Sequence, residues 1–184
     1  MILIYGGAFN PPTKAHYLIA EKLIEKYNPT SFYFLPVGMK YNKGELASFK
    51  DRYNMCSILA EKLNCLVSDK ENVDKYEGTY YTLKDFKKID EDVRFIMGAD
   101  NLSYLHNWIM ANKLVKEFKF VILERSNFDV LGYIKEHFNK YLDHFDIISF
   151  SSMVSSSKFR VNKDKALVLD DVYEYIVKNN LYEV

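Results

Sequence analysis

The chain has 184 residues, enough for one domain with a sizeable hydrophobic core. Its 25 Lys and Arg residues balance its 25 Asp and Glu residues, so no overall field attracts nucleic acid or an anionic membrane, and any anion site must be local. The longest apolar runs, such as FVIL at 120–123, are far too short to span a bilayer. We therefore expect neither a nucleic-acid nor a membrane partner.

The cysteines and the N-terminus bear on the location of the protein. Cys56 and Cys65 show neither metal-site nor disulfide spacing, which predicts reduced thiols. Strand-like residues begin already at Ile2, so we expect no targeting segment before the fold. Together these features predict a cytoplasmic protein. The sequence carries no signal of its oligomeric state.

Short apolar or β-branched runs alternate with longer segments of helical period along the whole chain. The runs that predict strands are 2–5, 31–37, 65–68, 93–97, 118–123 and 145–150. The segments that predict helices lie near 14–27, 49–64, 80–88, 101–116, 129–142 and 170–180. This alternation indicates an α/β fold, a single Rossmann-like, doubly wound parallel sheet with helices on both faces. We expect one domain over 1–184, with a C-terminal helical part over about 151–184.

The first predicted strand leads into a segment with features of a phosphate site. Gly6 and Gly7 follow it directly, and glycine lets a backbone turn sharply or a ligand approach closely. Two prolines then precede a helix whose expected N-cap is Thr13, and the N–H groups of such a helix start favour phosphate. His16 in the first turn should point into the crevice at the carboxyl ends of the strands. A tight turn followed by a hydrogen-bonded core histidine explains these residues equally well.

The chain has no glycine-rich nucleotide motif of either common kind, G-x-G-x-x-G or G-x-x-x-x-G-K-[ST]. A phosphate site here would therefore depend on the helix start and the histidine. The long irregular stretch GMKYNKGELAS at 38–48 follows a predicted strand, where a binding loop or lid is expected.

A second candidate phosphate site lies in SFSSMVSSSKFR at 149–160, where the last predicted strand leads into serines and a helical segment. Ser155, Ser156 and Ser157 can cap that helix and offer hydroxyl donors. Arg160, one turn further on, could present a guanidinium fork to phosphate oxygens. An ordinary polar cap accounts for the segment equally well when it is taken alone. Two such helix starts after strands of one sheet favour a polyphosphate held between them.

Five segments in order match motifs of one protein family. GGAFNPPTKAH is similar to GG-S-F-D-P…[HT]-x-G-H, and VSSSKFR to I-S-S-T-x-[IL]-R. GADNLSYLHNW at 98–108 is similar to G-A-D-x-L…L-x-x-W, and FLPVGMKYNKGELASFKDRYNM to a P-x-x-x-P-x-H-K loop followed by an R-x-x-M helix. The tail VYEYIVKNNLY is similar to a closing Y-I…L-Y. Over almost its whole length the chain thus resembles the nicotinate/nicotinamide mononucleotide adenylyltransferases of the nucleotidyltransferase superfamily.

The chain departs from the family motifs at several positions. Ala8 and Asn10 stand where the family usually has Ser and Asp, and Ala15 replaces a glycine. Asn42 replaces the histidine that precedes the loop lysine. Thr13 is an accepted variant of the first histidine, which leaves a single imidazole in this motif. These departures bear on rate and on fine substrate choice more than on the type of reaction.

The resemblance implies an attack by a mononucleotide phosphate on the α-phosphorus of ATP, which forms a dinucleotide and releases pyrophosphate. It implies Mg²⁺ held mainly by the substrate phosphates, with no metal ligand from the chain. The implied catalytic residues are His16, Thr13 and Arg160. The implied ATP-binding residues are Gly6, Gly7, Ala8, Phe9, Asp100, Ser155, Ser156, Ser157 and Lys43. The implied mononucleotide-binding residues are Trp108, which would stack on the pyridine, Thr79 and Asn10.

Alternatives to these assignments exist. Asp100 could instead be a helix N-cap, and a lone tryptophan such as Trp108 is more often a core residue. The length and motif set favour nicotinate mononucleotide as the substrate, with nicotinamide mononucleotide as the alternative. A phosphopantetheine adenylyltransferase is a further alternative, which the 98–108 stretch opposes. A non-catalytic nucleotide-binding protein would explain the departures at Ala8, Asn10, Ala15 and Asn42.

Overall fold

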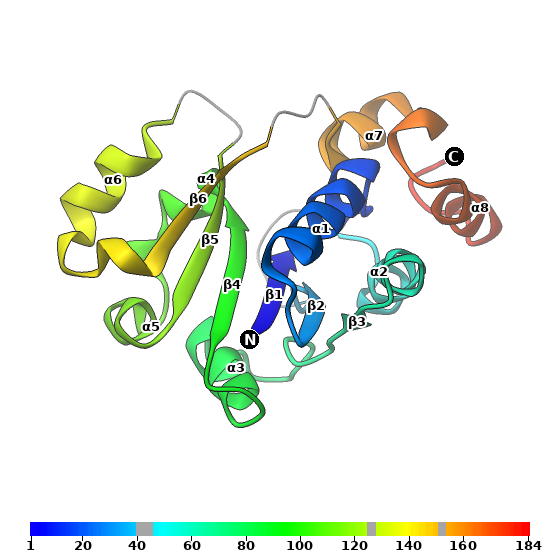
Figure 1. Cartoon of the computed structure of the whole chain (residues 1–184). Coiled ribbons are helices and arrows are strands. Elements are labelled where there is room, and N and C mark those ends of the chain that lie inside the picture. Colours follow the sequence, from blue (N-terminus) through cyan, green and yellow to red (C-terminus); the bar gives the residue numbers. More distant parts are fainter. Residues whose placement is uncertain (40–45, 125–127, 151–153) are drawn as a thin grey trace.

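The computed structural model describes residues 1–39, 46–124, 128–150 and 154–184. In these residues a six-stranded sheet has the order β3-β2-β1-β4-β5-β6, and every neighbouring pair is parallel (Figure 1). The strands are β1 (Ile2–Gly7), β2 (Ser31–Pro36), β3 (Leu66–Val67), β4 (Val93–Gly98), β5 (Lys119–Glu124) and β6 (Phe145–Ser149). The predicted parallel sheet is confirmed.

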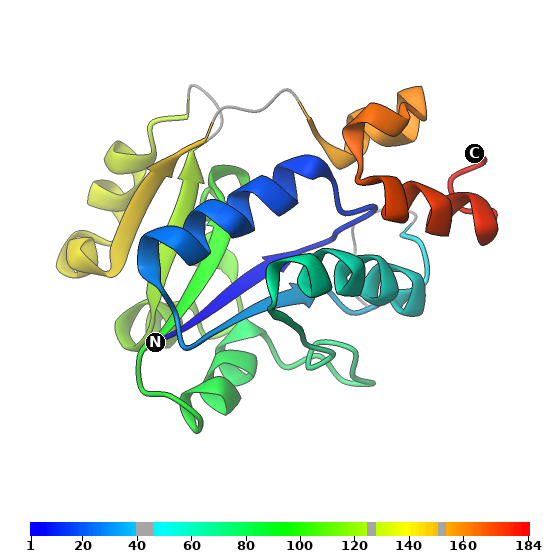
Figure 2. The ribbon, with the colours of Figure 1, turned by 45° about the vertical axis from the view of Figure 1, so that its right-hand side comes forward.

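Helices cover both faces of the sheet (Figures 1 and 2). The longer helices are α1 (Lys14–Tyr27), α2 (Phe49–Leu63), α3 (Thr79–Lys87), α6 (Val130–His137) and α8 (Asp170–Lys178). The shorter ones are α4 (Ala99–Leu102), α5 (Ala111–Glu117) and α7 (Ser156–Asn162). Three 3-10 turns complete the described elements: η1 (Leu105–Asn107), η2 (Asn139–His144) and η3 (Lys165–Leu167).

The strands serve two hydrophobic cores, because successive side chains of a strand point to opposite faces. In β1, Ile2 and Ile4 join a core with residues of α3, α5 and α6, whereas Leu3 and Tyr5 join a core with residues of α1, α2 and α8. Phe159 of α7 is also fully buried in the second core. The chain is therefore doubly wound, as its nearly continuous apolar strands predicted.

Polar residues at their ends set the bounds of the first two helices. The Ser48 side chain accepts a hydrogen bond from the Asp51 N–H at the start of α2. Asn28 after α1 and Asn64 after α2 both adopt the left-handed conformation that ends many helices. The sequence predicted both helices to within about one residue.

Two predicted helices are interrupted. Instead of one helix over 101–116, the chain forms α4, η1 and α5, with Met110 in a left-handed conformation (φ 60°) before α5. The turns allow Leu105 to be buried while Trp108 is carried to a cavity wall. The helix predicted over 129–142 ends at His137 and continues as η2.

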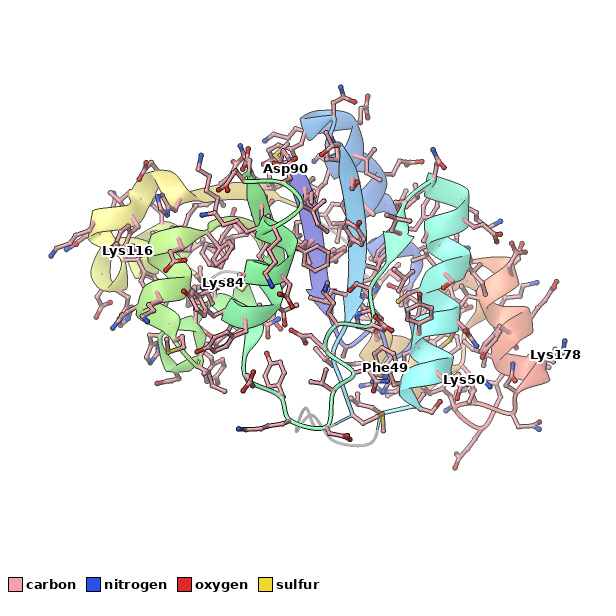
Figure 3. All side chains as sticks on the ribbon, turned by 90° about the horizontal axis from the view of Figure 1, so that it is seen from below. Phe49, Lys50, Lys84, Asp90, Lys116 and Lys178 are labelled. Carbon is pink, nitrogen blue, oxygen red and sulfur yellow. The ribbon has the colours of Figure 1, made fainter. Side chains whose placement is uncertain are left out.

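The strand order places a crevice at one end of the sheet. The order reverses between β1 and β4, and ligands of such sheets bind outside the carboxyl ends of the strands at this reversal. The charged surface is dispersed, with Lys116 and Lys178 at opposite ends of the molecule (Figure 3). No helix in the described ranges has the length and apolar character that a membrane span requires. Cys56 and Cys65 are both free.

Candidate active site

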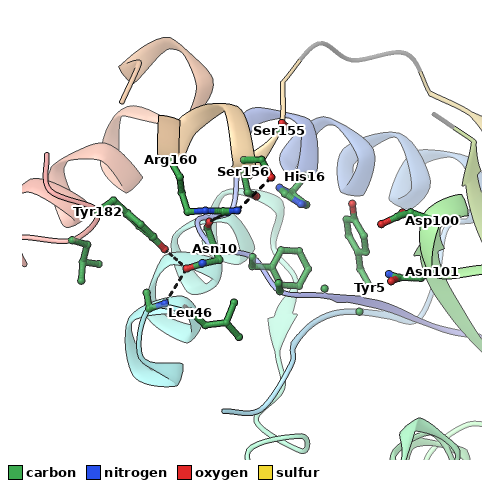
Figure 4. Close-up of a pocket in the computed structure, with 18 of the residues that line it drawn as sticks. Tyr5, Asn10, His16, Leu46, Asp100, Asn101, Ser155, Ser156, Arg160 and Tyr182 are labelled. Carbon is green, nitrogen blue, oxygen red and sulfur yellow. Dashed lines mark hydrogen bonds between the residues drawn. The ribbon is translucent and has the colours of Figure 1, made fainter. Parts of the chain in front are cut away.

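A cavity of about 1020 Å³ lies at the carboxyl ends of β1 and β4 (Figure 4). His16 of α1 and Arg160 of α7 both line it. Most of the residues expected to bind ATP line it as well: Gly6, Gly7, Ala8, Phe9, Asp100, Ser155, Ser156 and Ser157. The two helix starts thus meet at one cavity. Lys43 and Asn42 lie outside the described residues.

The His16 imidazole is held from behind by Thr13. The Thr13 backbone N–H donates to His16 Nδ1 at 2.9 Å, and the Thr13 hydroxyl lies 2.9 Å from the same nitrogen. Because a backbone N–H can only donate, Nδ1 is the acceptor, and a neutral ring then carries its proton on Nε2. Thr13 is fully buried, so it orients the imidazole. Thr13, which the resemblance implied as catalytic, lines neither cavity of the described residues and holds the imidazole from behind.

Aromatic rings flank the same imidazole. The centroid of Phe9 lies 5.1 Å from that of His16, and the centroid of Tyr5 lies 6.0 Å away. Phe9 has a φ of 47°, an uncommon left-handed conformation for a non-glycine residue, and its side chain is buried. The segment after β1 therefore bends sharply to press a ring against the histidine.

Asn10 joins three separate parts of the chain. Its Oδ1 accepts hydrogen bonds from the Ala47 N–H (3.0 Å) and the Tyr182 hydroxyl (2.8 Å), and its carbonyl accepts from Arg160 Nη1 (2.6 Å) (Figure 4). The side chain is buried in the wall of the large cavity. Asn10, which the resemblance implied for the mononucleotide, lines the large cavity beside Arg160 and not the small one.

The start of α7 is bonded to the segment that follows β1. The Ser156 hydroxyl donates to the Pro11 carbonyl at 2.8 Å. The Ser155 hydroxyl caps α7 by accepting from the Lys158 N–H at 3.2 Å, and Arg160 Nη2 donates to the Ser157 hydroxyl at 3.3 Å. Serine hydroxyls and a guanidinium therefore lie on one side of the cavity, with Asp100 at the other (Figure 4). The N-cap position of α4 is taken by Gly98, so Asp100 is not a cap.

A second cavity, of about 200 Å³, adjoins the first, because Gly6, Gly7, Ala8 and Asn101 line both. Trp108 and Thr79, the residues that the resemblance implied for the mononucleotide, both line the small cavity. The indole is half-buried and meets the Phe95 ring edge-on, with centroids 6.1 Å apart. It thus packs on the core and faces the cavity at once.

Close packing explains two glycines of the small cavity. A Cβ on Gly6 would lie 2.3 Å from a Phe95 ring carbon, so the glycine is required by the core as well as by any ligand. Gly78 has a φ of 105°, and a Cβ there would lie 2.8 Å from Ile109 Cβ. This close approach holds the start of α3 against the segment that carries Trp108.

Several residues of the site were missed by sequence analysis. Glu71 and Tyr76 line the small cavity, and Tyr182 lines the large one. Glu71 is only 4% exposed, and burial raises its pKa from an ordinary 4.5 to about 7. These residues lie in irregular segments, so no hydrophobic period marks them. For Tyr182, the closing L-Y motif was an available signal.

Arg52 is a further missed residue, although it belongs to the quoted R-x-x-M motif. It is fully buried in α2 and donates to the Ala47 carbonyl through Nε and to the Ala8 carbonyl through Nη1, both at 3.0 Å. Burial lowers the pKa of Arg52 below its ordinary value. The guanidinium therefore braces the backbone of the cavity wall.

Comparison with known proteins gives a consistent result. Residues 4–162 match the model of the cytidylyltransferase-like family. A protein of Acholeplasma laidlawii named "Probable nicotinate-nucleotide adenylyltransferase" is 34% identical over 191 residues, which cover 100% of this chain and 98% of that protein. A protein of the same name from Clostridium acetobutylicum is 35% identical, with 97% of each covered.

Solved structures agree with these relatives. The nicotinic acid mononucleotide adenylyltransferase of Plasmodium falciparum, complexed with NaAD, superposes with a TM-score of 0.77 and 26% identity over 99% of this chain and 97% of that one. The same enzyme complexed with APC gives a TM-score of 0.76 and 25% identity, covering 99% and 96%. The chain therefore belongs to the nicotinate-nucleotide adenylyltransferases, enzymes of the nucleotidyltransferase class with a cytidylyltransferase-like domain.

Proposed function

We propose that the chain joins nicotinate mononucleotide and ATP to give the deamido-NAD dinucleotide and pyrophosphate, a step of NAD biosynthesis. The observation that carries this proposal is the pair of adjoining cavities with a shared wall of Gly6, Gly7 and Ala8. The large one is sized and lined for a nucleoside triphosphate, and the small one offers an aromatic wall to a planar ring. The names of the relatives and the NaAD complex of the Plasmodium falciparum enzyme support the same pair of substrates.

In this proposal the reacting phosphates meet at the shared wall. A triphosphate in the large cavity would present its α-phosphorus near His16, while the pyridine ring stacks on Trp108 in the small cavity. The mononucleotide phosphate attacks the α-phosphorus in line, and no protein nucleophile is needed. Catalysis then consists of holding the two substrates together and of stabilising charge in the transition state.

Each side chain of the large cavity has a proposed role in that transition state. The Nε2–H of His16 donates to an α-phosphate oxygen as negative charge builds there, because its orientation is fixed through Nδ1. Arg160 and the serines 155–157 bind the β- and γ-phosphates and help pyrophosphate to leave. Asp100 accepts a hydrogen bond from a ribose hydroxyl, and Thr79 binds near the pyridine substituent. Lys43 is proposed to reach the same phosphates.

Nucleotidyltransferases generally use a divalent metal with their triphosphate, and we propose Mg²⁺. Among the described residues no group of three His, Cys, Asp or Glu side chains could hold a metal ion. Mg²⁺ prefers phosphate oxygens and water with one or two carboxylates. Of the described residues, the carboxylates that line the large cavity are Asp100, assigned above to the ribose, and Glu183, so the ion would be held mainly by the phosphates and by water. Such an ion would neutralise charge on the leaving pyrophosphate.

The proposed function is tested by steady-state turnover of each mononucleotide with ATP and Mg²⁺, read as dinucleotide and pyrophosphate formation. We expect turnover with nicotinate mononucleotide and none with phosphopantetheine, for which the indole wall of Trp108 offers no partner. Tight binding of ATP without any dinucleotide product would contradict the proposal and indicate a non-catalytic nucleotide-binding protein. We also propose that the whole chain acts as one domain in this reaction.

A further inference from the structure

The small cavity contains a buried carboxyl group that the proposed reaction does not use. Glu71 lies between β3 and α3 and is only 4% exposed. The Thr79 hydroxyl donates to Glu71 Oε1 at 3.4 Å, and the Tyr76 hydroxyl lies 2.9 Å from Thr79 Oγ1 and also hydrogen-bonds the carboxyl. All three residues line the cavity together with Trp108. An acid and two hydroxyls thus form one connected wall beside the proposed pyridine site.

The protonation state of Glu71 determines whether this wall can donate a hydrogen bond to a ligand or only accept one. An ionised carboxylate only accepts, so the hydroxyls of Thr79 and Tyr76 direct their hydrogens toward it or toward each other, and lone pairs face the cavity. A neutral carboxylic acid contributes a proton of its own. That proton takes the place of one hydroxyl hydrogen, which can then point into the cavity.

The two candidate substrates differ in charge and in their ability to donate a hydrogen bond. The carboxylate of nicotinate is negative and only accepts hydrogen bonds, whereas the carboxamide of nicotinamide is neutral and also donates through its NH₂. When Glu71 is ionised, the wall repels the nicotinate carboxylate and accepts a hydrogen bond from the nicotinamide NH₂. When Glu71 is neutral, the repulsion is absent and the wall can donate a hydrogen bond to the nicotinate carboxylate. Like charges in a buried site cannot both remain ionised without a large cost.

We propose that Glu71 is a specificity-determining residue, whose protonated form selects nicotinate mononucleotide and whose ionised form selects nicotinamide mononucleotide. This inference rests on the proposed function and deepens it. Glu71 acts through the hydroxyls of Thr79 and Tyr76, so it is a positioning residue of the mononucleotide pocket.

The surroundings of Glu71 keep both protonation states within reach. Burial raises its pKa to about 7, while the hydroxyls of Thr79 and Tyr76 lower it. The two lysines nearest Glu71 in the chain form ion pairs with other carboxylates: Lys70 with Asp85 at 3.9 Å, and Lys75 with Glu77 at 4.0 Å. Asp69 and Asp74 are further acidic residues of the same segment. Among the described lining residues, the other titratable groups are Tyr76 in the small cavity and Tyr5, His16, Asp100, Arg160, Lys163, Tyr182 and Glu183 in the large one.

The test compares kcat/KM of the wild type and of Glu71→Gln for each mononucleotide, from about pH 6 to about pH 8.5. Glutamine is permanently neutral and keeps an acceptor for Thr79. Dividing the wild-type kcat/KM by that of the variant removes every pH dependence that the two proteins share. With nicotinate mononucleotide this quotient should fall by up to about tenfold per pH unit above the pKa of Glu71, and with nicotinamide mononucleotide it should stay level or rise.

A matched control is Glu77→Gln, which neutralises an exposed carboxyl of the same segment and should keep the wild-type pH profile. If Glu71→Gln folds poorly, the wild type alone still tests the inference. Its kcat/KM for nicotinate mononucleotide, divided by its kcat/KM for nicotinamide mononucleotide, should fall as the pH rises. A flat ratio in the wild type, or equal profiles for wild type and Glu71→Gln, would overturn the inference while dinucleotide is still formed. Absence of dinucleotide from either mononucleotide would overturn the proposed function, and the inference with it.

Discussion

The imidazole of His16 is the side chain on which the proposed chemistry depends most. Thr13 fixes it through two contacts of 2.9 Å to Nδ1, and the rings of Phe9 and Tyr5 lie against it. A donor that is already oriented needs no reorganisation as charge develops in the transition state. The buried Thr13 and the left-handed backbone of Phe9 therefore both help to position the Nε2–H group of His16.

Replacing His16 by alanine should lower kcat by about 10²–10³, or about 2.7–4 kcal/mol of barrier, as for the loss of one oriented oxyanion donor. The measurement is the steady-state rate of dinucleotide formation at saturating substrates. His144→Ala is a suitable control, since its Nδ1 contacts the Val115 carbonyl and it lines neither cavity. Near-normal turnover of His16→Ala would refute the role of the imidazole.

Replacing Trp108 by alanine should mainly raise KM for the mononucleotide. Stacking of a base on an aromatic side chain contributes about 1–3 kcal/mol, so a rise of roughly 5- to 150-fold is expected, with KM for ATP unchanged. Trp108→Phe keeps an aromatic wall beside Phe95 and should show a smaller rise. If only KM for ATP changed, Trp108 would contact ATP and not the mononucleotide.

At the scale of the secondary-structure elements, the starts of α1 and α7 must keep a fixed spacing across the large cavity. The Ser156 hydroxyl and the Arg160 guanidinium make this link by donating to the backbone carbonyls of Pro11 and Asn10. A triphosphate that contacts both starts depends on their spacing. The link is therefore a structural requirement of the proposed ATP site.

Ser156→Ala removes the hydroxyl that donates to the Pro11 carbonyl. A lost hydrogen bond of this kind is worth about 0.5–1.5 kcal/mol, so KM for ATP should rise roughly two- to tenfold, with a smaller effect on the mononucleotide. Ser149→Ala is the matched control, because its hydroxyl donates to Glu124 outside the cavities. If both variants had the wild-type KM for ATP, the link would be dispensable.

The elements that could be predicted from the sequence are those with an unbroken period. Helix α1 repeats its apolar residues at steps of four, and its end is marked by Asn28. The segment over 101–116 misled the prediction because Leu102, Leu105 and Leu114 are all buried and hydrophobic, while the backbone between them leaves the helical conformation at Trp108 and Met110. Burial alone does not distinguish a helix from a folded-back loop.

For the molecule as a whole, the sequence predicted the crevice, the two helix starts and two lining residues of the smaller cavity, Trp108 and Thr79, but not the rest of its wall. The βα alternation and the turn after β1 are local signals, whereas the wall of Glu71 and Tyr76 depends on where an irregular segment packs. Tyr182 reaches Asn10 from the other end of the chain, 172 residues away. Such contacts exist only once the two cores have formed, so no local pattern reports them.

The buried acid Glu71 also links the site to the stability of the whole protein. A carboxyl whose pKa is raised on folding binds more protons in the native state than in the unfolded chain. Its contribution therefore favours the native state at low pH and is lost as the pH rises from about 4.5 to about 7. Asp85, beside Lys88, and Asp90, bonded to the N-terminal amine, have lowered pKa values and act in the opposite direction, losing their contribution as the pH falls.

Because these opposing groups are shared by both proteins, the free energy of unfolding of the wild type should be compared with that of Glu71→Gln at each pH. The wild type should lose stability relative to the variant across the window from about pH 4.5 to about pH 7, by on the order of 3 kcal/mol, and the difference should level off above it. Urea unfolding at a series of pH values measures this difference. Glu77→Gln, with its exposed carboxyl, should run parallel to the wild type. A difference between wild type and Glu71→Gln that stays constant with pH would show that folding does not raise the pKa of Glu71, so that the carboxyl is ionised near neutral pH and the wall of the small cavity has only its acceptor form there.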